Sequence, residues 1–164
     1  YRTKEKIPTN LGEFKVALGQ PDIVKEGTDL TMVSYGSTFN LCQESLKLLE
    51  QAGISVELID VQTLLPFDVD HKISASLEKT NRLVIVDEDV SSGASGFILD
   101  QILVKQKAYY LLDSEPVTVS AQDHRPAYST DGDYFSKPSI DDIFDAAYQI
   151  MHEADPEVYP NLLD

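Results

Sequence analysis

The chain has 164 residues, 42% of them hydrophobic, which is enough for one domain with a sizeable core. Its 28 acidic and 13 basic residues give a formal net charge of −15, which argues against nucleic acid or an anionic membrane surface as the main partner and leaves a basic protein partner open. The single cysteine, Cys42, excludes an internal disulfide framework and favours a reducing, intracellular setting, and no apolar run approaches the length of a membrane span.

Residues 1–27 are predicted to form an arm or linker that leads into the domain. The chain begins at Tyr1 instead of a methionine, and prolines and glycines interrupt this segment, so we expect a domain that belongs to a longer polypeptide. Residues 14–18 alternate apolar and polar side chains, which predicts an edge strand. Residues 28–154 are expected to form the domain itself, and residues 155–164 a polar tail.

Four apolar segments follow the arm, and each predicts a strand: residues 30–34, 54–60, 83–86 and 116–120. Between and after them, apolar residues at spacings of three and four predict helices with one buried face. Gly53 is placed to end the first helix, Asp68 or Asp70 to cap the second, and Ser95 to cap the third. Ser139, with Asp142 three residues later, forms a capping-box-like start for the last helix.

The alternation of strands and helices predicts an α/β fold. We expect a three-layer α/β/α sandwich on a mainly parallel sheet of about five strands, with room for one antiparallel edge strand. Residues 122–138 show no clear periodicity and are predicted to form a long loop. Loops of that length in compact domains usually carry function or dock on a partner.

The stretch 83–95 is the most informative part of the sequence. A buried strand ends there in three acids and a Ser/Gly loop, and ligands or partners usually meet α/β domains at the carboxyl ends of such strands. Adjacent residues of an extended strand point to opposite faces, so the three acids do not converge on one ion. We predict that this edge faces a neighbouring domain or subunit. The candidate interface residues are Asp87, Glu88, Asp89, Ser92, Gly93, Gly96 and Phe97.

The sequence contains no recognisable set of catalytic groups. Neither Gly36 nor the loop 92–96 matches a dinucleotide-binding or Walker motif, and no G-x-S-x-G elbow is present. Cys42 falls on a predicted buried helix face, which is typical of a structural cysteine. The histidines are far apart in the sequence and no cysteine pair exists. We therefore predict no catalytic, cofactor-binding or metal-ligating residue in this chain.

Two charged groups are candidate binding surfaces. Asp141, Asp142 and Asp145 lie near the start of the last helix, where carboxylates complement the helix dipole. Asp141 and Asp145 also share one helix face, which would suit basic residues of a partner. His124 and Arg125 in the long loop are a candidate anion contact, although partner docking or simple exposure is the favoured interpretation.

Three stretches carry a resemblance to a known family: DLTMVSYG at 29–36, GISVELIDVQTLLPFDVD at 53–70 and KTNRLVIVDED at 79–89. Together they are similar to the C-terminal domain of transketolase-like, thiamine-diphosphate enzymes, above all to the beta subunit of the 2-oxo acid dehydrogenase decarboxylating component. The segments 14–20, 23–27 and 137–143 resemble the same family, so the resemblance covers nearly the whole chain. The motif PFDVD at residues 66–70 favours the branched-chain (2-oxoisovalerate) type over the pyruvate type.

The resemblance implies a role within a larger oxidoreductase. In such an enzyme, other domains bind thiamine diphosphate and its magnesium ion. The cofactor supports decarboxylation of the 2-oxo acid, and the acyl group then passes to a lipoyl group. A domain of this kind is structural and serves subunit assembly and docking. The implied partners are the remaining domains or alpha subunit of the same enzyme, a second copy in a homodimer or heterotetramer, and the basic subunit-binding module of the lipoyl acyltransferase.

The same resemblance leaves two alternatives open. The chain could belong to a transferase similar to transketolase or deoxyxylulose-phosphate synthase, with His124 and Arg125 contacting a substrate phosphate. It could also be a free-standing binding module, which the missing initiator methionine disfavours. For the parent enzyme we expect the bacterial cytoplasm, or the mitochondrial matrix in a eukaryote, and we favour the cytoplasm.

Overall fold

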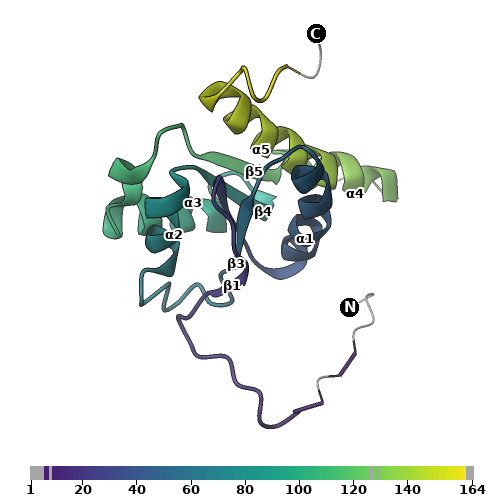
Figure 1. Cartoon of the computed structure of the whole chain (residues 1–164). Coiled ribbons are helices and arrows are strands. Elements are labelled where there is room, and N and C mark those ends of the chain that lie inside the picture. Colours follow the sequence, from purple (N-terminus) through teal and green to yellow (C-terminus); the bar gives the residue numbers. More distant parts are fainter. Residues whose placement is uncertain (1–5, 8, 126–127, 129, 162–164) are drawn as a thin grey trace.

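The computed structural model describes residues 6–7, 9–125, 128 and 130–161. A five-stranded sheet in the order β1-β3-β2-β4-β5 lies between helices on both faces (Figure 1). Its strands are β1 (Asp22–Lys25), β2 (Leu30–Ser34), β3 (Val56–Asp60), β4 (Leu83–Val90) and β5 (Val117–Ala121). β1 is antiparallel to β3 and all other pairs are parallel. The predicted α/β/α sandwich with an antiparallel edge strand is therefore confirmed.

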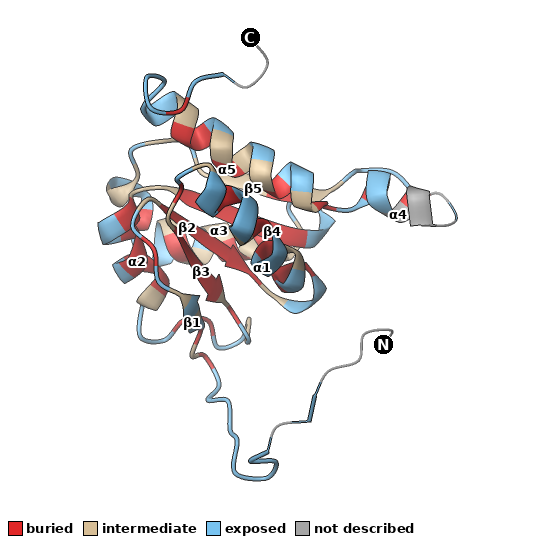
Figure 2. Ribbon diagram, turned by 45° about the vertical axis from the view of Figure 1, so that its right-hand side comes forward, coloured by how far each residue is buried: buried red, intermediate tan, exposed pale blue. Residues whose placement is uncertain are grey.

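The two faces of the sheet bury alternate residues of the same strands. On β2, Leu30 and Met32 pack toward α1 (Gly36–Gln51) and α5 (Ile140–Ala154), while Val33 packs on the opposite side. That opposite side is covered by α2 (Lys72–Thr80), by α3 (Ala94–Leu99) and by its π-helical continuation η1 (Asp100–Lys105). Figure 2 shows the central strands as an almost continuously buried layer. Strands covered on both sides must be apolar nearly throughout, as the sequence pattern predicted.

The antiparallel edge strand forms at a different place from the one predicted. Residues 14–18 are not a strand, and Phe14 and Leu18 are exposed; β1 forms at Asp22–Lys25 instead. Gly19 turns the chain just before β1 with a φ of +74°, a conformation that glycine adopts without strain. Its N–H donates to the hydroxyl of Thr63 at 2.6 Å, and its carbonyl accepts from the N–H of Val69 at 2.9 Å. These bonds fix the chain at residue 19, so regular pairing begins after it.

The long segment 122–138 contains a short helix that the sequence pattern did not predict. This helix, α4 (Thr130–Ser136), projects from the body beyond the start of α5 (Figure 2). Residues 126–127 and 129 of the segment lie outside the described residues. The carbonyl of Ser136 accepts from the N–H of Gln122 at 2.9 Å, which ties the end of α4 to the end of β5.

The segment after α5 packs back onto the domain. Tyr159 is buried beside Tyr148, with ring centroids 6.1 Å apart, and Tyr148 donates to the carbonyl of Pro160 at 2.8 Å. Nδ1 of His152 lies 2.6 Å from the carbonyl oxygen of Tyr159.

Another connector forms the 3-10 turn η2 (Ala108–Leu111). Within the described ranges, none of the helices is both long and apolar enough to cross a membrane.

Glu57 is a buried acid on the α2 side of β3. Its side chain is 2% exposed and pairs with Lys79, whose ammonium group also reaches the exposed carboxylate of Glu26 at 3.3 Å. The backbone N–H of Gly27 donates to Glu57 at 3.1 Å. Burial by itself raises the pKa of Glu57, but the hydrogen bonds from Lys79, Ser76 and Gly27 together outweigh burial and the pKa is lowered. The ionised carboxylate therefore stabilises the junction of β1, β3 and α2.

We predict that Glu57→Gln lowers the free energy of unfolding by about 1–3 kcal/mol at neutral pH, because a charged, hydrogen-bonded acceptor is lost. The lowered pKa means that this stabilisation is present above the unfolded-state value of about 4.3 and is lost as the pH falls through the folded-state value. Urea unfolding from pH 7 to pH 3 checks both points, and the gap between variant and wild type should shrink in acid. The matched control is Glu26→Gln, which removes the exposed partner of Lys79 and should change stability by less than about 0.5 kcal/mol. Equal losses in the two variants would contradict this assignment.

Candidate functional site

Asp87 lies at the carboxyl end of β4 and is fully buried. One of its oxygens accepts from the phenol of Tyr35 at 2.7 Å and from the N–H of Asp89 at 3.1 Å, and the other accepts from the N–H of Ser95 at 2.8 Å. Ser95 is near the start of α3, where helix N–H groups lack partners within the helix. The cap of α3 is therefore Asp87, and the predicted cap by the Ser95 side chain is wrong. Burial, and then the bond to Asp87, raise the pKa of the Tyr35 phenol well above its usual value.

The other acids of this edge face solvent. Glu88 accepts from the hydroxyl of Ser37 at the start of α1, and one carboxylate oxygen of Asp89 accepts from the N–H of Val90 at 2.8 Å. The three acids thus do not meet around one point, as the alternation along a strand predicts. Among the described residues, no group of three or more His, Cys, Asp or Glu side chains is arranged to hold a metal ion.

The remaining candidate interface residues lie in the loop after β4 and in α3, and they differ in exposure. Ser92 is exposed at a φ of +71°. Gly93 lies just before α3, at a position where a Cβ atom would be 2.7 Å from a carboxylate oxygen of Asp89. Gly96 is half-buried, and Phe97 turns inward to meet Phe67 edge to face at 6.0 Å. Contact of this edge with a neighbouring domain or subunit stays a prediction, and its accessible part is Glu88, Asp89 and Ser92.

The single thiol belongs to the core. Cys42 is buried on α1, and burial raises the pKa of its thiol to about 12. The hydroxyl of Ser45 donates to the carbonyl of Cys42 at 2.8 Å. A neutral buried thiol is a poor nucleophile, which agrees with the predicted structural role of Cys42.

The acids at the start of α5 have three different environments. The hydroxyl of Ser139 accepts from the N–H of Asp142 at 3.1 Å, and the Asp142 carboxylate accepts from the N–H of Ser139 at 2.8 Å, which forms the predicted capping box. Asp141 accepts from the phenol of Tyr134 at 2.8 Å. Asp145 is exposed one turn further along. The Asp142 carboxylate is used in the capping box, so Asp141 and Asp145 are the members of the group that can contact a partner without breaking the cap.

The candidate anion contact is exposed and held by local bonds. Arg125 donates to the phenol of Tyr128 at 2.8 Å and its guanidinium lies 5.6 Å from the centroid of that ring. Nδ1 of His124 lies 3.1 Å from the carbonyl oxygen of Arg125. The two side chains come from adjacent residues, and a role for them in binding an anion stays a prediction.

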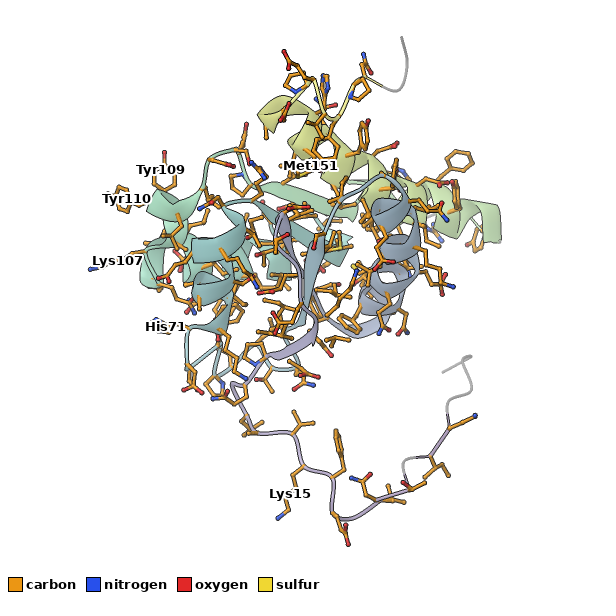
Figure 3. The ribbon with its side chains drawn as sticks, in the orientation of Figure 1. Lys15, His71, Lys107, Tyr109, Tyr110 and Met151 are labelled. Atoms are coloured by element: carbon orange, nitrogen blue, oxygen red, sulfur yellow. The ribbon has the colours of Figure 1, made fainter. Side chains whose placement is uncertain are left out.

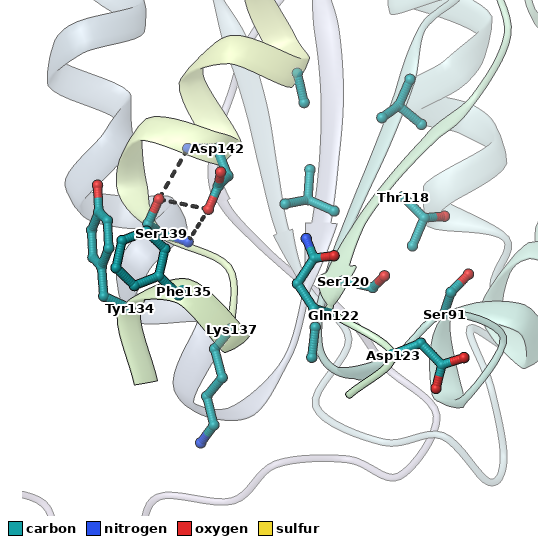
Figure 4. Close-up of a pocket in the computed structure, with 14 residues that line it drawn as sticks. Ser91, Thr118, Ser120, Gln122, Asp123, Tyr134, Phe135, Lys137, Ser139 and Asp142 are labelled. Carbon is teal, nitrogen blue, oxygen red and sulfur yellow. Dashed lines mark hydrogen bonds between the residues drawn. The ribbon is translucent and has the colours of Figure 1, made fainter. Parts of the chain in front are cut away.

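A cavity of about 690 Å³ runs along β5, and sequence reasoning did not anticipate it. Figure 4 shows Tyr134, Phe135 and Lys137 on one side of it and Gln122, Asp123 and Ser91 on the other. The only sequence signal for this cavity was the length of the segment 122–138, because the helix α4 that supplies its aromatic residues has no hydrophobic periodicity.

These features define a three-layer α/β domain whose carboxyl-terminal sheet edge is closed by its own side chains. Residues 19–137 match the family model described as transketolase, C-terminal domain. The chain belongs to the transketolase C-terminal domain family. The family resemblance predicted from residues 29–36, 53–70 and 79–89 is therefore confirmed.

Similar proteins include subunits of 2-oxo acid dehydrogenases. The pyruvate dehydrogenase E1 component subunit beta of Acholeplasma laidlawii is 34% identical over 125 residues, which cover 75% of this chain and 37% of that protein. The mitochondrial 2-oxoisovalerate dehydrogenase subunit beta of Chaetomium thermophilum is 41% identical over 93 residues, or 56% of this chain and 19% of that protein. A solved split-gene transketolase, described as an inactive beta4 tetramer, shares the fold with a TM-score of 0.69 at 22% identity, over 88% of this chain and 46% of that one. The chain thus spans about a third of the length of the A. laidlawii subunit.

We predict that Asp87→Asn lowers the free energy of unfolding by about 1–3 kcal/mol, because an amide presents one acceptor and two donors to groups that all donate. Hydrogen exchange at the amide of Ser95 should become faster in the same variant. Glu88→Gln, the same change one residue along in an exposed position, is the control and should stay within about 0.5 kcal/mol of wild type. An Asp87→Asn protein as stable as wild type would show that the buried carboxylate does not hold the edge together.

Proposed function

We propose that this chain is the C-terminal domain of the beta-type subunit of a thiamine-diphosphate-dependent 2-oxo acid dehydrogenase, and that its role there is structural. The observation that carries the proposal is that Asp87 binds Tyr35 and Ser95 of its own chain. Asp87 lies at the sheet edge where α/β enzymes usually bind ligands, and these internal hydrogen bonds occupy that edge. Support also comes from the family match and from the names of the two subunits described above. The domain would serve subunit assembly and docking, within an enzyme that transfers acyl groups to lipoyl groups.

The cofactor of such an enzyme would be held by other domains. Thiamine diphosphate supplies the electron sink for decarboxylation when it is bound, and its magnesium ion needs oxygen ligands around one point. The described residues provide no such ligand set, since the acids at the end of β4 diverge and Asp87 already accepts three hydrogen bonds. This chain would therefore contribute position and contact surface to the enzyme.

The partners would be an alpha subunit or the remaining domains, a second copy of the enzyme unit, and the lipoyl acyltransferase core. A formal charge of −15 would favour a basic docking module, because opposite charges speed association and align the partners. The start of α5 supplies two acidic charges, on Asp141 in its first turn and on Asp145 one turn further along. Such an enzyme would work in the cytoplasm, where the free thiol of Cys42 stays reduced.

We predict that reversing both charges, with Asp141→Lys and Asp145→Lys, weakens binding of the basic subunit-binding module of the acyltransferase by roughly tenfold or more at low salt. Titration calorimetry at two salt concentrations measures the loss and its salt dependence. The control reverses two exposed acids beyond the first turn of α5, Glu153→Lys and Glu157→Lys, for the same change in net charge. If both double variants bind equally, the first turn of α5 is not the docking surface.

The substrate of the parent enzyme is proposed to be a branched-chain 2-oxo acid. The wording of residues 66–70 favours this class, and the 41% identity to a 2-oxoisovalerate dehydrogenase subunit supports it. The longer match to a pyruvate dehydrogenase subunit makes pyruvate the competing substrate. The substrate is therefore decided by an assay of the whole enzyme.

We predict that the assembled parent enzyme oxidises 3-methyl-2-oxobutanoate with a kcat/KM at least about tenfold above that for pyruvate, since extra methyl groups in an apolar pocket carry that much discrimination. Reduction of an artificial electron acceptor measures both reactions with the same enzyme sample. A preference for pyruvate would reject the branched-chain proposal. Ketol transfer between sugar phosphates, with no oxidation of either acid, would favour the transferase alternative.

A further inference from the structure

The free edge of β5 is an accessible backbone surface. β5 is the last strand of the sheet and pairs with β4 alone, and no strand lies on its other side within the described residues. Such an edge presents unpaired N–H and C=O groups from alternate residues. The cavity of about 690 Å³ is lined by residues 117–123, which places open space beside this edge.

β5 carries none of the charges that commonly protect an edge strand. Its sequence VTVSA contains neither a charged residue nor a proline, and Pro116 lies just before its first residue. The opposite edge strand, β1, has the sequence DIVK with a charge at each end. Both edge pairs have an irregular register, between Ile23 and Lys25 on β1 and between Val86 and Val90 beside β5. The difference in charge indicates that pairing is disfavoured at β1 and permitted at β5.

Aromatic side chains stand beside the open edge. Tyr134 is 55% exposed and Phe135 is 75% exposed, and their rings meet edge to face at 5.8 Å. A second, mainly apolar cavity of about 480 Å³ adjoins Tyr134 and is lined by Leu41, Pro138 and Ile140. Exposed aromatic residues next to an apolar cavity are the usual anchors of a protein interface. A segment bound along β5 would therefore find side-chain contacts as well as backbone partners.

The charges around the edge decide which kind of segment fits. Glu115 precedes β5 and Asp123 follows it, and both are exposed. Glu88 and Asp89 lie beyond Ser91, while Lys137 and Arg125 are the basic residues nearby. A second copy paired antiparallel would oppose its own acidic flanks and another net charge of −15. The arm is no better candidate, because it joins the sheet through β1 at the opposite edge, so that its addition to β5 of another copy would be a head-to-tail contact (Figure 3 shows Lys15 far from the sheet).

We propose that the edge of β5 binds an extended segment of a partner protein as a sixth strand, and that this segment alternates apolar residues and carries basic residues at both ends. Backbone hydrogen bonds would supply affinity, and Glu115, Asp123 and the aromatic pair would supply selectivity. The inference is independent of the substrate and of the docking face on α5, because it rests on the unpaired edge of β5 and on the charges of Glu115 and Asp123 that flank it.

The test uses the 164-residue chain and a synthetic probe peptide, Lys-Arg-Val-Thr-Val-Thr-Val-Lys-Arg, observed by NMR of the labelled protein. We expect saturable shifts and slower amide exchange centred on residues 117–121. Two further peptides carry N-methyl groups on alternate backbone amides, in the two opposite registers. Only one register faces β5, so one of these peptides should lose at least tenfold in affinity and the other should keep it. Equal binding by both, or shifts centred elsewhere, would overturn strand addition.

Two controls test the charge requirement. The same peptide with Glu in place of each terminal Lys and Arg should bind at least tenfold more weakly, and Glu115→Lys with Asp123→Lys in the protein should reverse that preference. Glu153→Lys with Glu157→Lys makes an equal change in net charge away from β5 and should leave the preference unchanged. Tight binding of the acidic peptide to the wild-type chain would overturn the basic partner. Dimers in sedimentation, with β5 amides protected and no peptide added, would show that a second copy occupies the edge.

Discussion

The carboxylate of Asp87 joins three elements that would otherwise end separately. It accepts hydrogen bonds from Tyr35 before α1, from Asp89 at the end of β4 and from Ser95 at the start of α3. A buried carboxylate without partners costs several kcal/mol, so these donors are as necessary to the acid as the acid is to them. The edge of the sheet where ligands commonly enter is therefore filled by the chain itself. Any ligand there would have to replace three hydrogen bonds at once.

The central strands and the family were predictable from the sequence because both are encoded in short local sequence patterns. Strands buried on two faces need unbroken apolar runs, and the predicted segments 30–34 and 83–86 lie within β2 and β4. The capping box of Ser139 and Asp142 is similarly local. The position of β1 was not predictable in this way, since the alternation at residues 14–18 indicated an earlier strand and the sequence DIVK of β1 does not alternate apolar and polar residues. The bonds of Gly19 to Thr63 and Val69, which are distant in sequence, make the choice between them.

The role of Asp87 was hidden because its neighbours are also acids. Residues 87–89 form a uniform acidic patch in the sequence, yet Asp87 is buried and Glu88 and Asp89 are exposed. The period of two along β4 separates Asp87 from Glu88, since it places Asp87 on the same face as Leu83 and Ile85, toward α3. Asp89 shares that face but lies near the end of β4, where it is exposed. That argument needs the position of α3 as well as the strand. The helix α4 was missed for a related reason, because its contact with the end of β5 and not its periodicity defines it.

The two outer strands of the sheet show where this domain can still make contacts. β1 is short, charged and irregular in register, which limits pairing at that edge, and the carboxyl-terminal edge is closed by Asp87. Tyr109 and Tyr110 protrude from the α2 side (Figure 3), and they share a cavity with Asp113 and with Glu115, the acid that precedes β5. β5, α4 and the first turn of α5 remain, and they form one continuous border of backbone, aromatic and acidic groups. That border combines an unpaired strand with exposed carboxylates. A partner can form backbone hydrogen bonds with the strand only if its own backbone is extended, and it can form ionic contacts with the carboxylates only if it is positively charged.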